Sequence, residues 1–129
     1  MKTSDFKNLI VWQRSMELTE GIYLLIREFP PEERYALSDQ MRRSAVSIPS
    51  NIAEGQGRDS KQEFLRFISI ARGSLCEIET QLLIAQRIGY VSQVKVEPLV
   101  DKCAEVSRML RSLSTNLSSQ LQNSKTAQP

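Results

Sequence analysis

The sequence predicts an all-α fold, an antiparallel up-down four-helix bundle with a proline-kinked second helix. Four stretches have apolar residues at helical rather than alternating spacing. The connections between these stretches are short, and short connections make consecutive helices antiparallel neighbours. With 129 residues, the chain is predicted to be one domain over 1–129, with an ordered core over about 6–121.

The first predicted helix runs from Leu9 to about Glu28, with Asn8 as its N-cap. Pro30 and Pro31 are expected to end this helix, because a residue that precedes a proline avoids the helical conformation. Trp12 is predicted to be a core anchor or, alternatively, to face a neighbouring subunit. The predicted apolar face is wide and comprises Leu9, Val11, Trp12, Met16, Leu18, Ile22, Leu25, Ile26 and Phe29.

The second predicted helix runs from an N-cap at Ser38 to about Glu54. Pro49 lies inside its apolar stripe, and a proline there cannot donate a hydrogen bond to the carbonyl of Ala45. We therefore expect a kink, after which the helix ends at glycines in the left-handed conformation. The stripe comprises Leu37, Met41, Ala45, Ile48 and Ile52; Ser47, Ser50 and Asn51 are expected to bond to freed carbonyls, and Gly55 and Gly57 to form the cap.

The third predicted helix begins with a capping box, in which Ser60 is followed three residues later by Glu63. It extends to about Ile88, and Gly89 caps it. Gly73 lies in the helix interior, where glycine costs roughly 0.5–1 kcal/mol relative to alanine. We therefore expect another helix of the bundle, or of a second subunit, to approach closely there. The predicted buried face comprises Phe64, Phe67, Ile68, Ala71, Leu75, Ile78, Leu82 and Ala85.

The fourth predicted helix begins between Gln93 and Pro98. Its apolar residues are spaced almost as in a heptad repeat, and they are Leu99, Cys103, Val106, Leu110, Leu113, Leu117 and Leu121. The residues beyond them are rich in Ser, Gln and Asn, so the tail over 122–129 is predicted to be disordered.

Composition excludes several classes of function. The formal charge of +2 is too small to indicate nucleic-acid binding by itself, and the absence of histidine removes the commonest metal ligand and general base. Cys76 and Cys103 are at apolar helical positions and are expected to be buried thiols. No segment approaches the roughly 18 apolar residues of a membrane span, and the N-terminus lacks an apolar signal core. We expect a cytoplasmic protein without a membrane partner.

No pattern of catalytic residues is found. The sequence has no metal-ligand spacing of Cys and His and no phosphate-binding loop, and Ser47 and Ser50 have no histidine partner. Glu54, Asp59 and Glu63 are close in sequence and leave a hydrolase with a carboxylate-bound metal as one alternative, although solvated caps are the commoner role of such residues. We predict that the protein is not an enzyme and has no cofactor.

Three segments resemble a known family. They are LIVWQRSMEL over 9–18, RRSAVSIPSNIAEGQGR over 42–58 and FLRFISIARGSLCEIETQL over 64–82. The chain resembles the four-helix-bundle proteins encoded by intervening sequences of bacterial large-subunit ribosomal RNA genes, from about Phe6 to Tyr90 and more loosely to Leu117. The resemblance implies assembly into a ring of five copies but no defined activity. A more distant similarity is to the accessory protein of diversity-generating retroelements, which looks like a pentameric ring that binds a reverse transcriptase and nucleic acid.

The first and third helices have more apolar surface than two neighbours require, which indicates a subunit interface. Six basic residues within 31 positions are candidates for binding an RNA or DNA backbone: Arg42, Arg43, Arg58, Lys61, Arg66 and Arg72. They could alternatively be ordinary surface charge with helical pairs such as Glu63–Arg66. Arg42, Arg43 and Arg58 could also fix the second helix to Glu54 or to acidic residues of a neighbouring subunit. The motif residues predicted to be structural are Pro49, Ser50, Asn51, Glu54, Gly55 and Gly73.

From these observations we predict a non-enzymatic homo-oligomer that forms a ring, a pentamer by resemblance. Its predicted role is a scaffold or adaptor for nucleic acid or for a nucleic-acid enzyme. The alternative is a protein-binding or structural oligomer with no affinity for nucleic acid.

Overall fold

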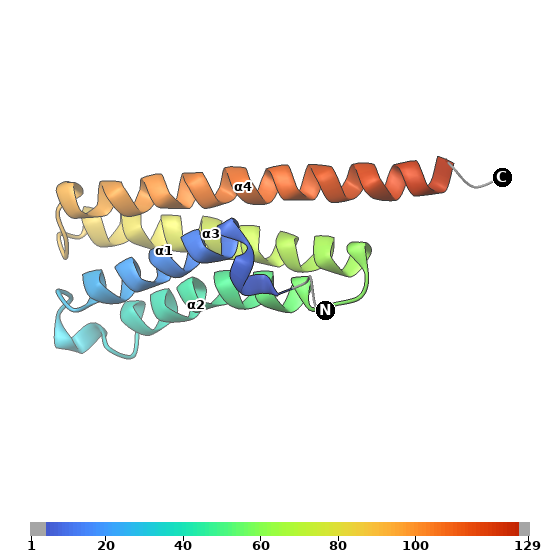
Figure 1. Cartoon of the computed structure of the whole chain (residues 1–129). Helices are drawn as coiled ribbons and strands as arrows, with labels where there is room; N and C mark the ends of the chain where they lie inside the picture. Colours follow the sequence, from blue (N-terminus) through green and yellow to red (C-terminus); the bar gives the residue numbers. More distant parts are fainter. Residues whose placement is uncertain (1–4, 127–129) are drawn as a thin grey trace.

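The computed structural model describes residues 5–126, and side chains as far as Ser124. Successive helices lie side by side, and the chain turns back at each connection (Figure 1). α1 packs against α2 and α4, and α3 also packs against α2 and α4. The described residues are helical without strands, which confirms the predicted fold class. The elements are η1 (Phe6–Asn8), α1 (Ile10–Ile26), η2 (Pro31–Glu33), α2 (Leu37–Gln56), α3 (Lys61–Arg87) and α4 (Gln93–Thr126).

The start of α1 differs from the prediction. Asp5 caps the 3-10 turn η1 by accepting a hydrogen bond from the Lys7 backbone N–H at 3.0 Å. Leu9 is the N-cap of α1 and makes no side-chain cap, so the prediction of Asn8 as N-cap is wrong. The turn places Phe6 against Trp12, edge to face with ring centroids 5.2 Å apart. Trp12 is half-buried against the core, and its contact with a neighbouring subunit stays a prediction.

The start of α2 is capped by Glu33 and not by the predicted Ser38. The backbone N–H of Leu37 donates to Glu33 Oε1 at 3.1 Å, which satisfies one of the donors left free at a helix start. Ser38 lies inside the first turn and is only 3% exposed. The prediction of Ser38 as N-cap is therefore wrong, because the preceding 3-10 turn brings a carboxylate to the helix end.

The end of α2 corrects a second expectation. Gly57 has φ −76°, a right-handed conformation, so the predicted left-handed cap is wrong. Gly55 is buried inside the helix and serves a different purpose. A Cβ at this position would lie 2.7 Å from Phe67 Cβ and 2.9 Å from Phe64 Cδ1. Glycine therefore allows α2 and α3 to approach each other here.

Pro49 lies inside α2, and the carbonyl of Ala45 receives a hydrogen bond from another helix. Thr19 Oγ1 of α1 is 3.0 Å from Ala45 O and also 2.9 Å from Ser15 O. The small polar neighbours of Pro49 act elsewhere: Asn51 Nδ2 donates to the carbonyl of Ser47 at 2.7 Å. The freed carbonyl therefore lies within hydrogen-bond distance of a hydroxyl across the α1–α2 contact, and Ser15 O shares that hydroxyl. The kink itself stays a prediction.

The prediction for α3 is confirmed in its caps and its core. Ser60 Oγ accepts a hydrogen bond from the Glu63 backbone N–H at 3.1 Å, and all eight predicted core residues are buried. Gly89 has φ +85°, the left-handed conformation that favours glycine. Gly73, however, is exposed, and a Cβ there would meet nothing within 4 Å. A close helix approach at Gly73 within the chain is therefore wrong, while contact with a second subunit stays a prediction.

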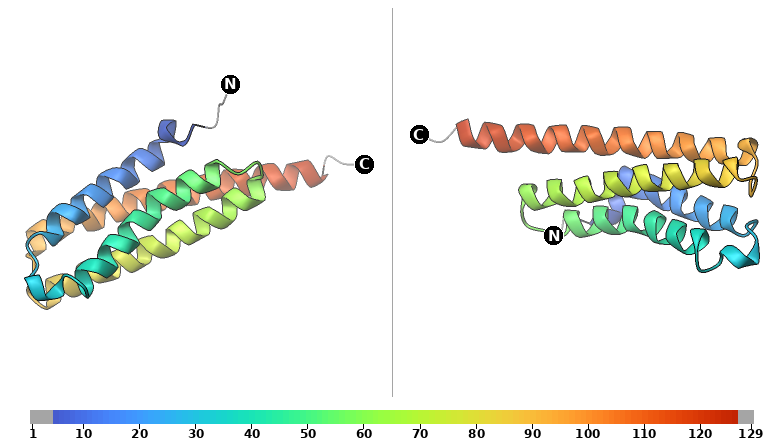
Figure 2. Two further views of the ribbon diagram at one scale, coloured as in Figure 1. Left: turned by 90° about the horizontal axis from the view of Figure 1, so that it is seen from below. Right: turned by 180° about the vertical axis from the view of Figure 1, so that it is seen from behind.

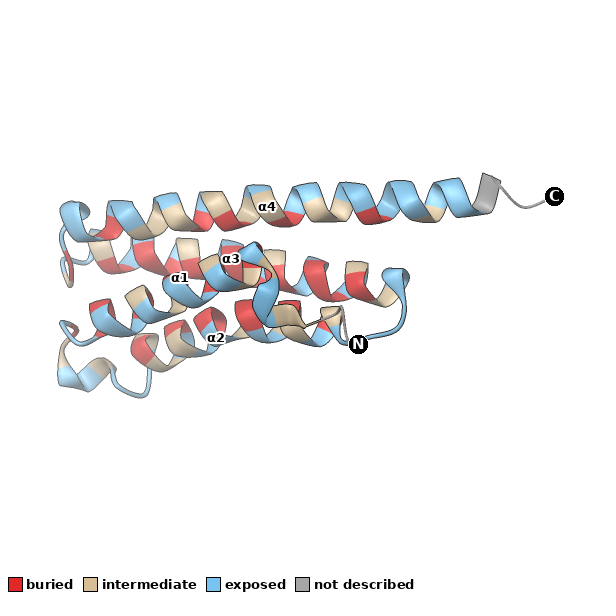
Figure 3. Cartoon of the chain, in the orientation of Figure 1, coloured by how far each residue is buried: buried red, intermediate tan, exposed pale blue. Residues whose placement is uncertain are grey.

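α4 is longer than the sequence predicted. It continues past the end of the α2–α3 pair (Figures 1 and 2), and this extension is mostly exposed (Figure 3). Residues 122–126 of the predicted disordered tail are helical, and 127–129 lie outside the described residues. Leu117 is buried and Leu121 half-buried, so the apolar seam continues into this region. Once a helix is formed, each added residue gains a hydrogen bond, which extends it beyond the packed part.

The two cysteines differ. Cys103 is 1% exposed, and burial raises the pKa of its thiol to about 12. Cys76 is exposed on α3, so the prediction that both thiols are buried is wrong for Cys76. Cys76 falls one residue after Leu75, outside the buried stripe of α3.

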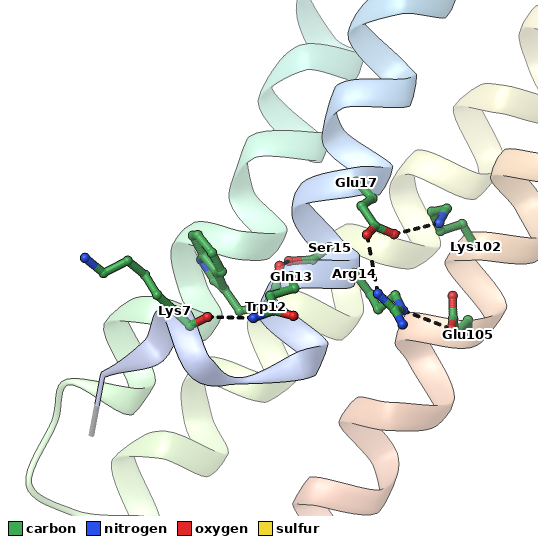
Figure 4. Close-up of polar contacts among 8 residues, drawn as sticks. All are labelled: Lys7, Trp12, Gln13, Arg14, Ser15, Glu17, Lys102 and Glu105. Atoms are coloured by element: carbon green, nitrogen blue, oxygen red, sulfur yellow. Dashed lines mark hydrogen bonds and ion pairs between the residues drawn. The ribbon is translucent and has the colours of Figure 1, made fainter. Parts of the chain in front are cut away.

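Charged residues join α1 to α4 (Figure 4). Arg14 contacts Glu17 at 3.3 Å and Glu105 of α4 at 3.4 Å, while Lys102 Nζ lies 3.0 Å from Glu17 Oε1. The hydrogen bond and charge of Lys102 hold the pKa of Glu17 below its ordinary value. This α1–α4 seam therefore neutralises its own charges.

Candidate functional site

The structure separates the six predicted basic residues along α2 and α3. Arg42 and Arg43 lie in its second turn, whereas Arg58 and Lys61 lie at the α2–α3 connection. At 1.5 Å per residue, the helix from Arg43 to Gln56 is about 20 Å long. Arg66 and Arg72 follow along α3. The six residues therefore do not form one compact patch on a single chain.

The α2–α3 corner, formed by Glu54, Arg58, Glu63, Arg66 and Phe67, is internally paired. Arg58 lies 3.0 Å from Glu54, and Arg66 lies 3.2 Å from Glu63. Both guanidinium groups also stack over the ring of Phe67, at 5.1 and 4.6 Å from its centroid. The corner therefore has the helical pairs that the sequence offered as an alternative to nucleic-acid binding.

The remaining candidates differ in their partners. Arg43 is paired with Asp39 at 3.3 Å. Arg42 Nη2 donates to the backbone carbonyl of Arg34 at 3.0 Å. Within residues 5–126, neither Lys61 nor Arg72 forms an ion pair.

The predicted structural motif is mostly placed on the α2–α3 side. Ser47 and Ser74 share a hydrogen bond of 2.8 Å between their hydroxyl groups, and Asn51 also donates to Ser47 Oγ at 2.9 Å. Ser50 is exposed and borders the opposite side of α2, beside Pro49. This network and the close approach at Gly55 fix how α2 lies on α3.

An apolar groove lies between α1 and α2. It has a volume of about 430 Å³ and is almost entirely apolar. Met16 of α1 is 44% exposed and Val46 of α2 is 41% exposed, although both are large apolar residues. The two helices separate towards the N-terminal end of α1 in the left view of Figure 2. We call this the α1–α2 groove; its apolar residues are Trp12, Met16, Tyr23, Val46, Pro49 and Ala53.

A second exposed apolar surface lies near the C-terminal end of α3. Leu83, Ile84 and Ile88 are each between 42% and 52% exposed. Leu83 and Ile84 border a shallow hollow of about 350 Å³ together with Thr80, Gln86 and Arg87, and the exposed Ile88 follows directly after them. We call Thr80, Leu83, Ile84, Arg87 and Ile88 the α3 outer face. No residue of this face lines the α1–α2 groove, so one chain presents two different apolar surfaces.

Sequence reasoning missed a basic cleft at the α1–α2 connection. Arg27 and Arg34 lie there together with the predicted Arg42, around a volume of about 410 Å³. The available signal was the pair of prolines, Pro30 and Pro31, which turn the chain back towards α2. The predicted set of basic residues spans only Arg42 to Arg72, so it omits Arg27 and Arg34.

Among the described residues, no group of three or more Asp, Glu, Cys or His side chains is arranged to hold a metal ion. The carboxylates proposed as an alternative are instead placed at the α2–α3 corner, where Glu54 and Glu63 pair with arginines. In the same part of the chain, no helix is both long and apolar enough to cross a membrane.

Comparison with known proteins identifies the family. The sequence pattern of the 23S rRNA-intervening sequence proteins matches residues 7–112. The chain belongs to this family. It is also similar to a crystal structure from Bacteroides thetaiotaomicron, described as a protein of unknown function from the S23 ribosomal protein family. The two share 25% sequence identity with a TM-score of 0.73, over 81% of this chain and 97% of that one. No match was found among curated proteins.

Membership confirms the resemblance stated from the three sequence segments. The family description names an origin in ribosomal RNA genes, and the similar crystal structure has unknown function. Neither names an activity. The similarity to the retroelement accessory protein stays a prediction.

Proposed function

We propose that the protein is a non-enzymatic helical bundle that assembles head to tail into a closed ring, with the α3 outer face of one copy in the α1–α2 groove of the next. The observation that supports this proposal is the pair of unlike apolar surfaces on one chain. A contact between two different surfaces is heterologous, and it closes into a ring when the rotation between copies permits. A ring of five copies is the size that the family resemblance implies.

The two surfaces suit each other in chemistry. The groove is lined by two aromatic side chains, a methionine and smaller apolar groups, while the α3 outer face presents three branched aliphatic side chains. Methionine adapts to irregular contacts, so it can accommodate such side chains. Burial of each of the three aliphatic side chains would stabilise the contact between copies by on the order of 1 kcal/mol or more.

The proposed role of the ring is to scaffold nucleic acid or a nucleic-acid enzyme. Repetition around the ring would multiply the arginines that have no carboxylate partner within one chain, such as Arg42 and Arg72. Binding through such residues depends on phosphate contacts and therefore weakens with salt.

The second candidate function is a structural or protein-binding oligomer without nucleic-acid affinity. It is favoured by one observation: Arg43, Arg58 and Arg66, half of the predicted basic residues, are already paired with carboxylates. Paired charges contribute less to phosphate binding because the carboxylate offsets their field.

Light scattering tests the assembly. The wild-type protein is expected to have a mass several times 14.7 kDa at micromolar concentration. Val46→Glu in the groove should lower the mass to that of one chain, because it would bury a charge in the contact. Val94→Glu is the matched control, since Val94 is 81% exposed at the start of α4 and lies outside both surfaces. A wild-type monomer would contradict the proposal.

Titration with a structured RNA at two salt concentrations separates the two roles. The scaffold role predicts binding at low salt that weakens steeply as salt rises. No binding at low salt, or binding that salt does not change, would leave the structural oligomer as the remaining function.

A further inference from the structure

The cleft at the α1–α2 connection has the form of a ligand site. Three arginines converge on it from different segments: Arg27 directly after α1, Arg34 directly after η2, and Arg42 from the second turn of α2. We call it the arginine cleft. Its volume of about 410 Å³ lies within the range of small-molecule sites, which is roughly 300–1,000 Å³. Every part of it belongs to a single chain.

The charges of the arginine cleft are not neutralised. No carboxylate lines it, and Arg27, Arg34 and Arg42 form no ion pair within the described part of the chain. In contrast, Arg43, the direct neighbour of Arg42, is paired with Asp39. Three positive charges therefore face one cavity without a counter-charge from the protein.

Of the acidic residues nearest in sequence, Glu28 and Glu33 have partners outside the cleft, and Glu32 does not line it. Glu33 accepts hydrogen bonds from the Tyr90 hydroxyl at 2.6 Å and from the Leu37 backbone N–H at 3.1 Å. Glu28 is paired with Lys95 at 2.8 Å. Glu33 thus contacts α2 and the α3–α4 connection, and Glu28 contacts α4. The cleft itself is lined by the three arginines, of which Arg34 also lies over the Tyr35 ring, 5.9 Å from its centroid.

The cleft is also held in shape. The hydrogen bond from Arg42 Nη2 to the carbonyl of Arg34 ties α2 to the connection at 3.0 Å. A guanidinium has five N–H donors, so Arg42 retains others for a ligand. Pro30 and Pro31 fix the backbone between Arg27 and Arg34. Little ordering is therefore required when a ligand binds, which favours affinity.

We infer that the arginine cleft binds a phosphate group of a nucleotide, which can be a free nucleotide or part of a nucleic-acid strand. Guanidinium groups match phosphate oxygens in geometry and form paired, charge-assisted hydrogen bonds with them. Tyr23 borders both the cleft and the α1–α2 groove and is 42% exposed, so in a single chain its side chain can stack on a base. The inference goes beyond the proposed function because it needs neither the ring nor a partner protein.

Calorimetric titration tests the inference with three probes: inorganic triphosphate, ATP, and a short single-stranded RNA with either a 5′-phosphate or a 5′-hydroxyl. The wild-type protein should bind at least one phosphate-bearing probe. Arg27→Gln and Arg34→Gln should each weaken that binding at least tenfold, because a lost hydrogen bond to a charged group has an effect of this order. Tighter binding of ATP indicates a free nucleotide, and tighter binding of the RNA indicates a strand.

Arg43→Gln is the matched control, because it removes the same charge one residue from the cleft but outside its lining. It should change the affinity less than twofold. The inference is overturned if no probe binds at millimolar concentration, or if Arg43→Gln weakens binding as much as Arg27→Gln. The monomeric Val46→Glu variant, in which no other copy covers Tyr23, should bind at least as tightly as the wild type does, so failure of assembly and failure of the cleft are separate outcomes.

Discussion

The two sides of α2 pack differently. Towards α3, the helix is closely packed: Gly55 leaves room for the Phe67 side chain, and the hydroxyls of Ser47 and Ser74 are hydrogen-bonded to each other. Towards α1, the helix is joined by the contact of Thr19 with Ala45 O, but Val46 remains exposed in an open groove. The closed side shows what determines the fold of one chain. The open side shows which surface is available to another molecule.

A substitution in the α2–α3 contact has the largest expected effect on stability. Gly55→Ala would place a Cβ 2.7 Å from Phe67 Cβ, so the two helices must move apart. Overpacking of this kind typically lowers the free energy of unfolding by about 1–3 kcal/mol. Gly73→Ala is the matched control, because a Cβ there meets nothing within 4 Å. It should raise stability by roughly 0.5–1 kcal/mol through helix propensity alone.

Urea denaturation monitored by circular dichroism measures both glycine variants at the same protein concentration. Equal effects of the two substitutions would contradict a close approach at Gly55. A loss of assembly in Gly73→Ala without a loss of stability would place Gly73 in a subunit contact.

Loss of the hydrogen bond between α1 and α2 has the next largest expected effect on stability. Thr19→Val removes the hydroxyl that contacts the carbonyl of Ala45, and should lower stability by about 1 kcal/mol. Pro49→Ala restores the backbone N–H that could bond to the same carbonyl within α2. A double-mutant cycle in urea should therefore show a smaller effect of Thr19→Val in the Pro49→Ala background. Additive effects would mean that Thr19 does not replace the missing donor.

The smallest effect concerns pH at the α1–α2 connection. The hydrogen bonds from the Tyr90 hydroxyl and from the Leu37 N–H hold the pKa of Glu33 below its ordinary value of 4.5. The unfolded chain then binds more protons than the folded chain, so the stabilisation is present above pH 4.5 and is lost as pH falls through the folded-state pKa. Tyr90→Phe should reduce this acid-dependent loss, measured as urea midpoints at pH 7 and pH 3. An unchanged difference between the midpoints would contradict the role of Tyr90.

Much of the fold follows from periodicity. The stripes of α2, α3 and α4 were predictable because packing against two neighbours requires one apolar face at helical spacing. The same reasoning distinguishes the two glycines: Gly55 continues the buried stripe three residues after Ile52, whereas Gly73 falls between Ala71 and Leu75 and outside it. Small size alone therefore does not predict a close approach, because the position of the glycine around the helix axis also decides it.

The caps and the arginine cleft could not be predicted in the same way. The donor at the start of α2 is satisfied by Glu33, a residue whose position depends on a 3-10 turn between helices. Arg27 and Arg34 meet Arg42 only after the chain reverses at Pro30 and Pro31. Such contacts depend on the conformation of the segment between two helices, which the spacing of apolar residues in the sequence does not indicate.

The central claim is that the open side of α2 receives the α3 outer face of another copy. The most direct test mixes Val46→Glu, whose groove is disrupted, with Ile84→Glu, whose α3 outer face is disrupted, and measures mass by light scattering. Each variant alone should be a monomer, and the mixture should form a one-to-one dimer, because one intact groove and one intact outer face remain. A mixture that stays monomeric, or an Ile84→Glu variant that assembles as the wild type does, would contradict the head-to-tail contact.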